Sequence, residues 1–360
     1  MIRVLVAEDS AAVRALLVEI LNAADNIEVV GEATNGNDVV QQTQRLHPDV
    51  ITMDIHMPIL DGLAATELIM RTAPTPIVIV SSAVQQSDLE MTMRALQVGA
   101  VAAIPKPEHP SAEGFDDYAT QLIETVRAMA QIKVVRRRSP LSGMPTPTSG
   151  VPVHTEEGND EPAIIESPHQ TFPAARIVAI ATSTGGPAAL QTILSTIPKS
   201  LSVPVLVVQH IATGFVPALV GWLNQTSALP VVIAESGVPL QGGMVYVAPN
   251  DAHLGVAHDH ILLSREGPIG GFRPSGTYLF RSVSAAFGEA AMGVILTGMG
   301  RDGVEGLRVL RAAGGFVVAQ NEKTSVVFGM PAEAVQADLV DRVLPLGQIS
   351  AAIAARVGSA

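Results

Sequence analysis

The chain has 360 residues, a formal net charge of −12 at pH 7, and a composition that is 48% hydrophobic but only 3% aromatic. Two domains are expected at this length, and the shortage of aromatic residues suits α/β domains with aliphatic cores. The chain contains no cysteine, which excludes disulfides, thiolate metal sites and cysteine nucleophiles.

The acidic charge is concentrated toward the N-terminus. Residues 1–130 hold 7 basic and 18 acidic side chains, whereas residues 173–360 hold 11 of each. A DNA-reading output domain would carry a basic face, so we predict no nucleic-acid partner. Charged residues come too early for a secretory signal peptide, and no apolar run is long enough to cross a bilayer. We therefore expect a cytoplasmic protein without membrane insertion.

Residues 1–125 alternate short apolar runs with amphipathic segments, which is the pattern of a parallel, doubly wound sheet. The expected helices include Ala12–Ala23, Asp61–Arg71 and Tyr118–Ala130. The expected strands are Val4–Ala7, Val29–Glu32, Val50–Met53, Ile77–Val80 and Val101–Ile104. We predict a first α/β domain over residues 1–130.

Polar side chains follow four of these strands. Glu8 and Asp9 come after the first, Asp54 after the third, Ser81 ends the fourth, and Lys106 follows the fifth. The carboxyl ends of parallel strands meet at one edge of a sheet, so these groups should converge. Three carboxylates there would repel one another unless a hard cation such as Mg²⁺ lies between them. Lys106 and Ser81 would then contact a phosphoryl group.

This half of the chain resembles a response-regulator receiver domain of flavodoxin-like fold. The motifs that carry the resemblance are Glu8-Asp9, Asp54-x-x-Met57-Pro58, Asp61-Gly62, Ser81 and Lys106-Pro107. It implies that a histidine kinase phosphorylates Asp54. It also implies that Mg²⁺ is held by Asp9, Asp54 and the backbone carbonyl of His56, with Glu8 acting through water. Ala103 stands where many receivers carry an aromatic switch residue, so a rotating aromatic side chain is not expected here.

Residues 131–172 differ in character from both flanking parts. Prolines are interspersed there with serine, threonine, glycine and acidic residues, and apolar periodicity is weak. Such a composition is typical of an extended, flexible linker.

The α/β pattern resumes in residues 173–360, for which we predict a second doubly wound parallel sheet, Rossmann-like in type. Its expected strands are Ile177–Ile180, Val203–Val208, Val231–Ala234, Met244–Val247, Gly293–Leu296 and Phe316–Ala319.

The first of these strands runs into the sequence Thr182-Ser-Thr-Gly-Gly-Pro187. Two glycines permit a sharp turn, and Pro187 is suited to the first position of a helix. Ser183 is therefore expected at a strand end, beside the unpaired N–H groups of a helix N-terminus. Such a serine is either a nucleophile or part of a phosphate-binding turn.

His210 and Asp302 are expected at the same edge of the second sheet as Ser183, because each follows another predicted strand. A serine needs a base, and a base needs an orienting carboxylate, so the three together predict a catalytic triad. Taken singly, His210 would more often be structural and Asp302 a capping residue. The phosphate-binding alternative lacks both a G-x-G-x-x-G frame and a Walker lysine.

Three further features remain open. His253 borders the predicted crevice without an assigned role in proton transfer, and Arg273 would either pair with a substrate carboxylate or fix a loop. The pair His258 and His260 has the spacing of metal ligands but falls in a predicted hairpin turn, where solvent exposure is the favoured interpretation.

The second half also resembles the catalytic domain of the CheB-type protein-glutamate methylesterases. The matching motifs are Ala181-Thr-Ser183-Thr-Gly-Gly-Pro187, Gln209-His210, Ala248-Pro249, Arg273-Pro-Ser275, Gly293 to Gly303, Asn321-Glu322 and Val327 to Pro331. The resemblance implies Ser183 as nucleophile, His210 as general base and Asp302 as its orienting carboxylate. Backbone amides near Thr184 and Met299 are candidates for the oxyanion hole. Ala181, the segment Ile211–Thr213 and Phe272 depart from the usual pattern.

Together the two resemblances imply a phosphorylation-activated esterase of chemotaxis adaptation. The implied substrates are γ-glutamyl methyl esters on methyl-accepting chemoreceptors, with release of methanol, and receptor glutamines as targets of deamidation. The implied phosphodonor is the chemotaxis histidine kinase. Mg²⁺ is expected in the receiver and no cofactor in the esterase domain. The alternatives are a DNA-binding output, a nucleotide-binding or scaffolding domain, and a receiver-linked serine hydrolase or scaffold that serves a non-chemotactic receptor array.

Overall fold

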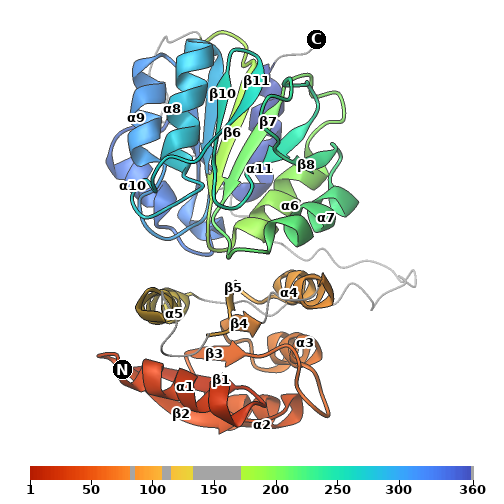
Figure 1. The fold of residues 1–360 in the computed structure, drawn as a ribbon, viewed down its shortest axis with the longest axis vertical. Coiled ribbons are helices and arrows are strands. Elements are labelled where there is room, and N and C mark those ends of the chain that lie inside the picture. Colours follow the sequence, from red (N-terminus) through yellow and green to blue (C-terminus); the bar gives the residue numbers. More distant parts are fainter. Residues whose placement is uncertain (82–85, 108–114, 133–171, 358–360) are drawn as a thin grey trace, which may run out of the picture.

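The computed structural model describes residues 1–81, 86–107, 115–132 and 172–357. It contains two parallel sheets, each covered by helices on both faces, so the predicted α/β class with doubly wound sheets is confirmed (Figure 1). We call residues 1–132 the N-terminal unit and residues 172–357 the C-terminal unit. The predicted linker over residues 131–172 lies almost entirely outside the described residues. Among the described helices, none combines the length and the apolar character that crossing a membrane requires.

The sheet of the N-terminal unit has the strand order β2-β1-β3-β4-β5. Its strands are β1 (Ile2–Ala7), β2 (Ile27–Ala33), β3 (Val50–Met53), β4 (Ile77–Ser81) and β5 (Ala102–Pro105). The helices are α1 (Ala11–Asn22), α2 (Gly36–Leu46), α3 (Gly62–Thr72), α4 (Gln86–Val98) and α5 (Phe115–Met129). Strands β3 and β4 are buried along their whole length, because helices cover both of their faces.

The sheet of the C-terminal unit has the strand order β14-β13-β12-β6-β7-β9-β8. Its strands are β6 (Ile177–Thr182), β7 (Val205–Gln209), β8 (Val231–Ile233), β9 (Val245–Val247), β12 (Ala291–Ile295), β13 (Phe316–Gln320) and β14 (Arg342–Leu344). A separate antiparallel hairpin consists of β10 (His253–Ala257) and β11 (His260–Ser264).

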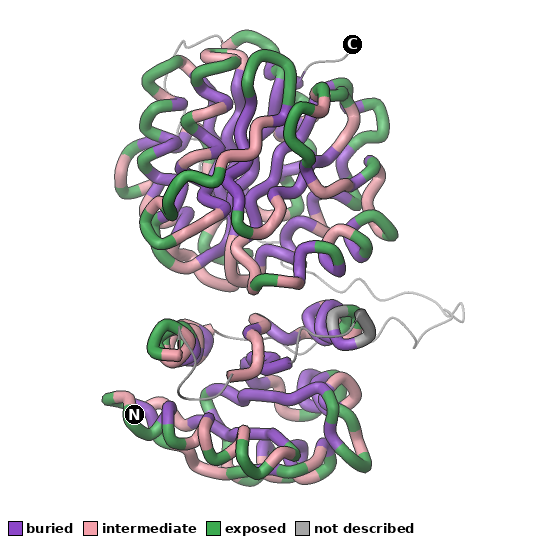
Figure 2. Tube along the Cα trace, viewed as in Figure 1, coloured by how far each residue is buried: buried purple, intermediate pink, exposed green. Residues whose placement is uncertain are grey.

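Helices cover both faces of this second sheet, and its central strands β6, β7, β9, β12 and β13 are buried along their whole length (Figure 2). The helices are α6 (Gly186–Thr196), α7 (Val216–Thr226), α8 (Gly276–Phe287), α9 (Val304–Ala312), α10 (Met330–Gln336) and α11 (Leu346–Val357), with short 3₁₀ turns at Gly288–Ala290 and Glu322–Thr324. Every strand predicted from the sequence is present, and most bounds agree within two residues. Strand β14 was not predicted from the sequence, because a segment of three residues, of which only Leu344 is buried, carries no periodicity.

The order of the second sheet decides where a site can form. Strand β6 lies between β7 on one side and β12 on the other, and all three run parallel. The chain leaves β6 for β7 in one direction and later returns to β12 on the other side. At such a switch point the loops after the strands diverge, which leaves a crevice at the carboxyl edge.

The two units contact each other through the α4 side of the first sheet. Helix α4 packs against α7 and α6, and α4 and α5 lie on the side of the N-terminal unit that faces the C-terminal unit (Figure 1). The residues that follow β6 and β7 are therefore close to this junction.

We predict that Val207→Ala lowers the free energy of unfolding of the C-terminal unit by about 2 kcal/mol, because Val207 is fully buried in β7 and the lost methyl groups leave a cavity. The matched change Val309→Ala, at a side chain that is 42% exposed on α9, should cost less than about 0.5 kcal/mol. Urea unfolding followed by the fluorescence of Trp222, the one tryptophan of the chain, measures both. Equal losses would contradict the assignment of the core.

Candidate active site

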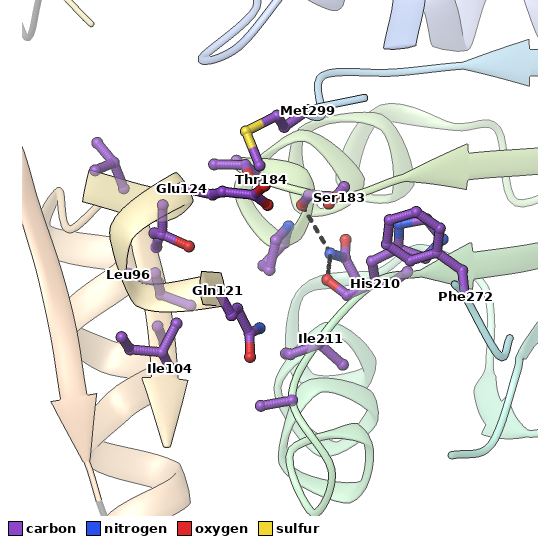
Figure 3. Close-up of a pocket in the computed structure, with 18 of the residues that line it drawn as sticks. Leu96, Ile104, Gln121, Glu124, Ser183, Thr184, His210, Ile211, Phe272 and Met299 are labelled. Carbon is purple, nitrogen blue, oxygen red and sulfur yellow. Dashed lines mark hydrogen bonds between the residues drawn. The ribbon is translucent and has the colours of Figure 1, made fainter. Parts of the chain in front are cut away.

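Ser183, His210 and Asp302 lie after β6, β7 and β12, the three strands that meet at the switch point. Main-chain hydrogen bonds tie the loops to the sheet: the Ser183 N–H donates to the Thr297 carbonyl at 3.0 Å, and the His210 N–H donates to the Thr182 carbonyl at 2.9 Å. Ser183 and His210 line the same pocket, whose volume is about 440 Å³ (Figure 3).

Asp302 is a buried carboxylate surrounded by hydrogen-bond donors, with 3% of its side chain exposed. Its Oδ2 lies 2.9 Å from His210 Nε2, and its Oδ1 accepts a bond of 2.7 Å from the Ser275 hydroxyl. Three backbone N–H groups also donate to it, those of Gly276 (2.6 Å), Thr277 (3.1 Å) and Gly303 (2.9 Å). Gly276 and Thr277 open α8, so a helix N-terminus adds its partial positive charge.

These contacts decide the ionisation of Asp302. Burial alone would raise the pKa of this carboxyl group. The hydrogen bonds from His210, Ser275 and Gly276, together with the charge of His210, act in the opposite direction and lower the pKa to about 2. Asp302 is therefore anionic at neutral pH, and its carboxylate contacts the imidazole of His210.

The imidazole of His210 contacts Asp302 at one edge of the ring and Phe272 at one of its faces. Its Nε2 faces Asp302, and Phe272 stacks on the ring with centroids 4.1 Å apart and an angle of 3° between the planes (Figure 3). Its Nδ1 is buried and has no hydrogen-bond partner among the described residues. Since Nε2 faces Asp302, Nδ1 is the ring nitrogen that remains free to form another hydrogen bond. No hydrogen bond joins the Ser183 hydroxyl to His210 within the described part of the chain.

The loop that carries Ser183 is shaped by glycines. Gly185 has a φ of 76°, a left-handed conformation that favours glycine, and it precedes α6, which begins at Gly186. Gly298 allows the loop after β12 to approach the serine, because a Cβ at that position would lie 2.8 Å from Ser183 Cβ. The approach brings Met299 to the pocket, which Thr184 also lines.

The structure shows the contacts of the residues whose role the sequence left undecided. His253 is fully buried outside the pocket: its Nδ1 accepts from the Ser275 N–H at 3.2 Å, and its Nε2 lies 3.1 Å from the Gly267 carbonyl. Arg273 lines the pocket while its guanidinium bonds to Asp251 and to a loop carbonyl. The segment His258–His260 is exposed at the turn of the β10–β11 hairpin, as predicted.

Sequence reasoning gave no site role to Ser275, Gln209 or the Phe272 stack. Ser275 and Gln209 could have been identified as polar side chains within otherwise buried segments. A buried polar group needs a hydrogen-bond partner, so such residues are candidates for a structural or site role. Nothing in the sequence pattern indicated that Phe272 would lie on His210.

The acidic cluster of the N-terminal unit forms at the carboxyl edge of the first sheet. Ligand oxygens of Glu8, Asp9 and Asp54 lie within 4.8 Å of one another. Lys106 Nζ lies 3.0 Å from both carboxylate oxygens of Glu8 and 2.9 Å from Asp54 Oδ2. Ser81 is buried at the end of β4, and its carbonyl accepts from the Lys106 N–H at 3.0 Å.

The charge balance of this cluster is incomplete. Glu8 and Asp54 are buried, and burial raises the pKa of each carboxyl group although Lys106 opposes the shift. One oxygen of each has no hydrogen bond of good geometry among the described residues. All three side chains offer hard oxygen ligands, so the donor set fits Mg²⁺. His56, two residues beyond Asp54, lies beside the cluster, with its N–H 3.3 Å from Asp54 Oδ1 and its ring paired with Asp88 at 2.8 Å.

The pocket at Ser183 is a junction between the two units. Residues of β5 and α5 line it from the N-terminal unit, opposite the loops of Ser183 and His210. Figure 3 shows Gln121 and Glu124 extending from α5 into the space in front of Thr184 and Ile211.

Comparisons with known proteins match both parts of the chain. Residues 178–353 match the CheB methylesterase family, and residues 4–112 match the response regulator receiver domain. A relative from Myxococcus xanthus (strain DK1622), named protein-glutamate methylesterase/protein-glutamine glutaminase 4, is 48% identical over 97% of this chain and 95% of its own length.

Two solved structures from Thermotoga maritima are similar to separate parts of the chain. The CheB methylesterase catalytic domain is 36% identical and covers 50% of this chain and 97% of its own, with a TM-score of 0.48. The response regulator domain of CheB is 41% identical and covers 37% of this chain and 98% of its own, with a TM-score of 0.34.

We predict that Asp302 stabilises the fold in a pH-dependent way. Its pKa is lower in the folded chain, about 2, than the ordinary 3.8, so the stabilisation is present above pH 4 and is lost as the pH falls toward 2. Between about pH 5 and pH 3 the wild type should lose about 1 kcal/mol more than Asp302→Asn. Urea unfolding of both proteins, followed by Trp222 fluorescence across this range, tests the difference. Parallel pH profiles would contradict the prediction.

Proposed function

This chain belongs to the CheB methylesterase family, and from that premise we propose that it is a protein-glutamate methylesterase that also acts as a protein-glutamine glutaminase. In this proposal residues 1–130 are a receiver domain and residues 173–360 the catalytic domain. The observation that carries the proposal is that His210, whose Nε2 lies 2.9 Å from Asp302 Oδ2, lines one pocket together with Ser183. The substrates would be γ-glutamyl methyl esters and glutamines of methyl-accepting chemoreceptors.

The first step uses Ser183 and His210. The Ser183 hydroxyl attacks the ester carbonyl while His210 Nδ1 takes its proton, and the anionic Asp302 stabilises the imidazolium that results. The tetrahedral intermediate collapses, the bond to the methoxy group breaks, and His210 returns the proton so that methanol leaves. An acyl-enzyme remains. With a glutamine substrate the leaving group is ammonia.

The second step hydrolyses the acyl-enzyme. His210 removes a proton from water, the hydroxide attacks the same carbonyl, and the Ser183 oxygen leaves with the proton, which yields glutamate. In both steps the backbone N–H groups near Thr184 and Met299 would stabilise the negative charge on the carbonyl oxygen. The loss of one such donor costs about 10²–10³ in rate in comparable sites.

The acidic cluster supplies the regulatory half of the proposal. A histidine kinase would phosphorylate Asp54, with Lys106 and Ser81 contacting the added phosphoryl oxygens. Asp9, Asp54 and the backbone carbonyl of His56 would hold Mg²⁺, with Glu8 acting through water. The ion would neutralise the charge that gathers as the phosphoryl group is transferred. Because Ala103 stands on β5 where many receivers carry an aromatic switch residue, a rotating aromatic side chain at this position would not transmit the signal in this mechanism.

The proposal also assigns the receiver an inhibitory role before phosphorylation. Support comes from the pocket at the junction, which Thr120, Gln121 and Glu124 of α5 line opposite Ser183. A receptor helix could not reach Ser183 while α5 occupies that side. Phosphorylation of Asp54 would shift the equilibrium toward an arrangement in which the two units separate.

We expect Ser183→Ala to abolish methanol release from methylated receptor, since no other hydroxyl is proposed as the nucleophile. Ser195→Ala, at an exposed serine of α6, is the matched control and should retain full turnover. Radiolabelled methyl groups on the receptor measure both. Full turnover by the Ser183 variant would show that the triad assignment is wrong.

We expect Mg²⁺ with a small-molecule phosphodonor to raise the activity of the full chain at least several-fold, because phosphorylation opens the junction. Asp54→Asn should not respond, whereas Asp25→Asn, at an exposed position, should respond as the wild type does. A fragment that begins at residue 172 should be active without the phosphodonor. Gating fails as an explanation if this fragment and the unphosphorylated full chain are equally active.

A further inference from the structure

The side chain of Gln209 connects the two loops that carry Ser183 and His210. Gln209 is the last residue of β7 and is only 3% exposed. Its Nε2 donates one hydrogen bond to the Ser183 carbonyl and another to the His210 carbonyl, each of 2.8 Å, and dashed lines mark both bonds in Figure 3. One amide nitrogen thus uses both of its protons to join the loop of the nucleophile to the loop of the base.

The bond to Ser183 has a consequence for the next residue. The Ser183 carbonyl and the Thr184 N–H belong to the same planar trans peptide, so they point in opposite directions. The Ser183 carbonyl accepts hydrogen bonds from Gln209 Nε2 and from the Gly186 N–H, the latter at 2.9 Å, and these two bonds fix its direction. The Thr184 N–H is consequently turned to the other side of the peptide, and Thr184 lines the pocket. Among the described residues this N–H has no acceptor.

The second glycine of the Ser183 motif makes this arrangement possible. A Cβ at Gly186 would lie 2.0 Å from Gln209 Oε1 and 2.5 Å from Thr182 Oγ1, so any larger residue would displace the glutamine side chain. The two glycines therefore have different tasks. Gly185 adopts the left-handed conformation of the turn, and Gly186 leaves room for Gln209.

We propose that Gln209 is a positioning residue of the hydrolysis: its amide holds the Ser183–Thr184 peptide so that the Thr184 N–H faces the developing oxyanion, and it holds the backbone of His210 at a matching position. The inference rests on the proposed function. A donor of this kind stabilises the transition state more than the bound ester, so its misalignment lowers kcat and leaves KM nearly unchanged.

The test compares two buried glutamines. Gln209→Met keeps the length of the side chain but loses both hydrogen bonds. Gln320→Met is the matched control, because Gln320 is a fully buried glutamine at the end of β13 that bonds to Thr297 and Thr324 and to neither Ser183 nor His210. In the full chain, activated with Mg²⁺ and a phosphodonor, we expect Gln209→Met to lower kcat for methanol release about 10–100-fold with KM within about twofold. The control should lower kcat less than about threefold at a similar loss of stability.

A second measurement tests the role of Gln209 without using the receptor substrate. A fluorophosphonate probe labels an activated serine by forming an Oγ–P bond with loss of fluoride, and it places an oxygen where the oxyanion would lie. Labelling of Ser183 should slow about 10–100-fold in Gln209→Met, even if the receptor ester is not the substrate. The inference is overturned if Gln209→Met retains kcat and the labelling rate, if its loss is no larger than that of Gln320→Met, or if KM alone changes. A wild type that shows neither methanol release nor labelling would overturn the proposed function as well.

Discussion

Both candidate sites of this chain depend on one constraint, the common direction of parallel strands. Every strand of a parallel sheet ends at the same edge, so residues distant in sequence meet there. Glu8, Asp54 and Lys106 converge in this way in the N-terminal unit. In the C-terminal unit the switch point around β6 brings the loops of Ser183, His210 and Asp302 together. The central strands of each sheet are buried on both faces, which anchors this edge in the core of each unit.

The buried carboxylates at the two sheet edges have pKa values shifted in opposite directions. Asp302 is surrounded by N–H and O–H donors, which lower its pKa to about 2 despite its burial. It is therefore anionic at neutral pH, and its Oδ2 faces the imidazole of His210. Glu8 and Asp54 share Lys106 as their charged partner, and burial raises the pKa of both. Their charge is only partly balanced, which suits a site that would gain a cation and a phosphoryl group.

The two edges are linked at the junction of the units. The pocket at Ser183 is completed by residues of β5 and α5, and β5 precedes Lys106 of the acidic cluster. Lys106 contacts Asp54 directly after β5, and residues of β5 line the side of the pocket that faces Ser183. In the proposed function these contacts would convert phosphorylation of Asp54 into access for the receptor helix. The inferred task of Gln209 is separate, since it concerns how the exposed site is aligned.

The sequence by itself determined the α/β class, the strand positions and the residues that follow each strand, because hydrophobic periodicity and glycine turns are local signals. From these, the meeting of Ser183 with His210 and Asp302 at one sheet edge could be anticipated. The tertiary structure alone decided that Nε2 of His210 faces Asp302, that Phe272 stacks on the ring, and that Gln209 joins the two loops. Such contacts depend on how side chains pack between elements far apart in the chain, and no local pattern encodes that packing.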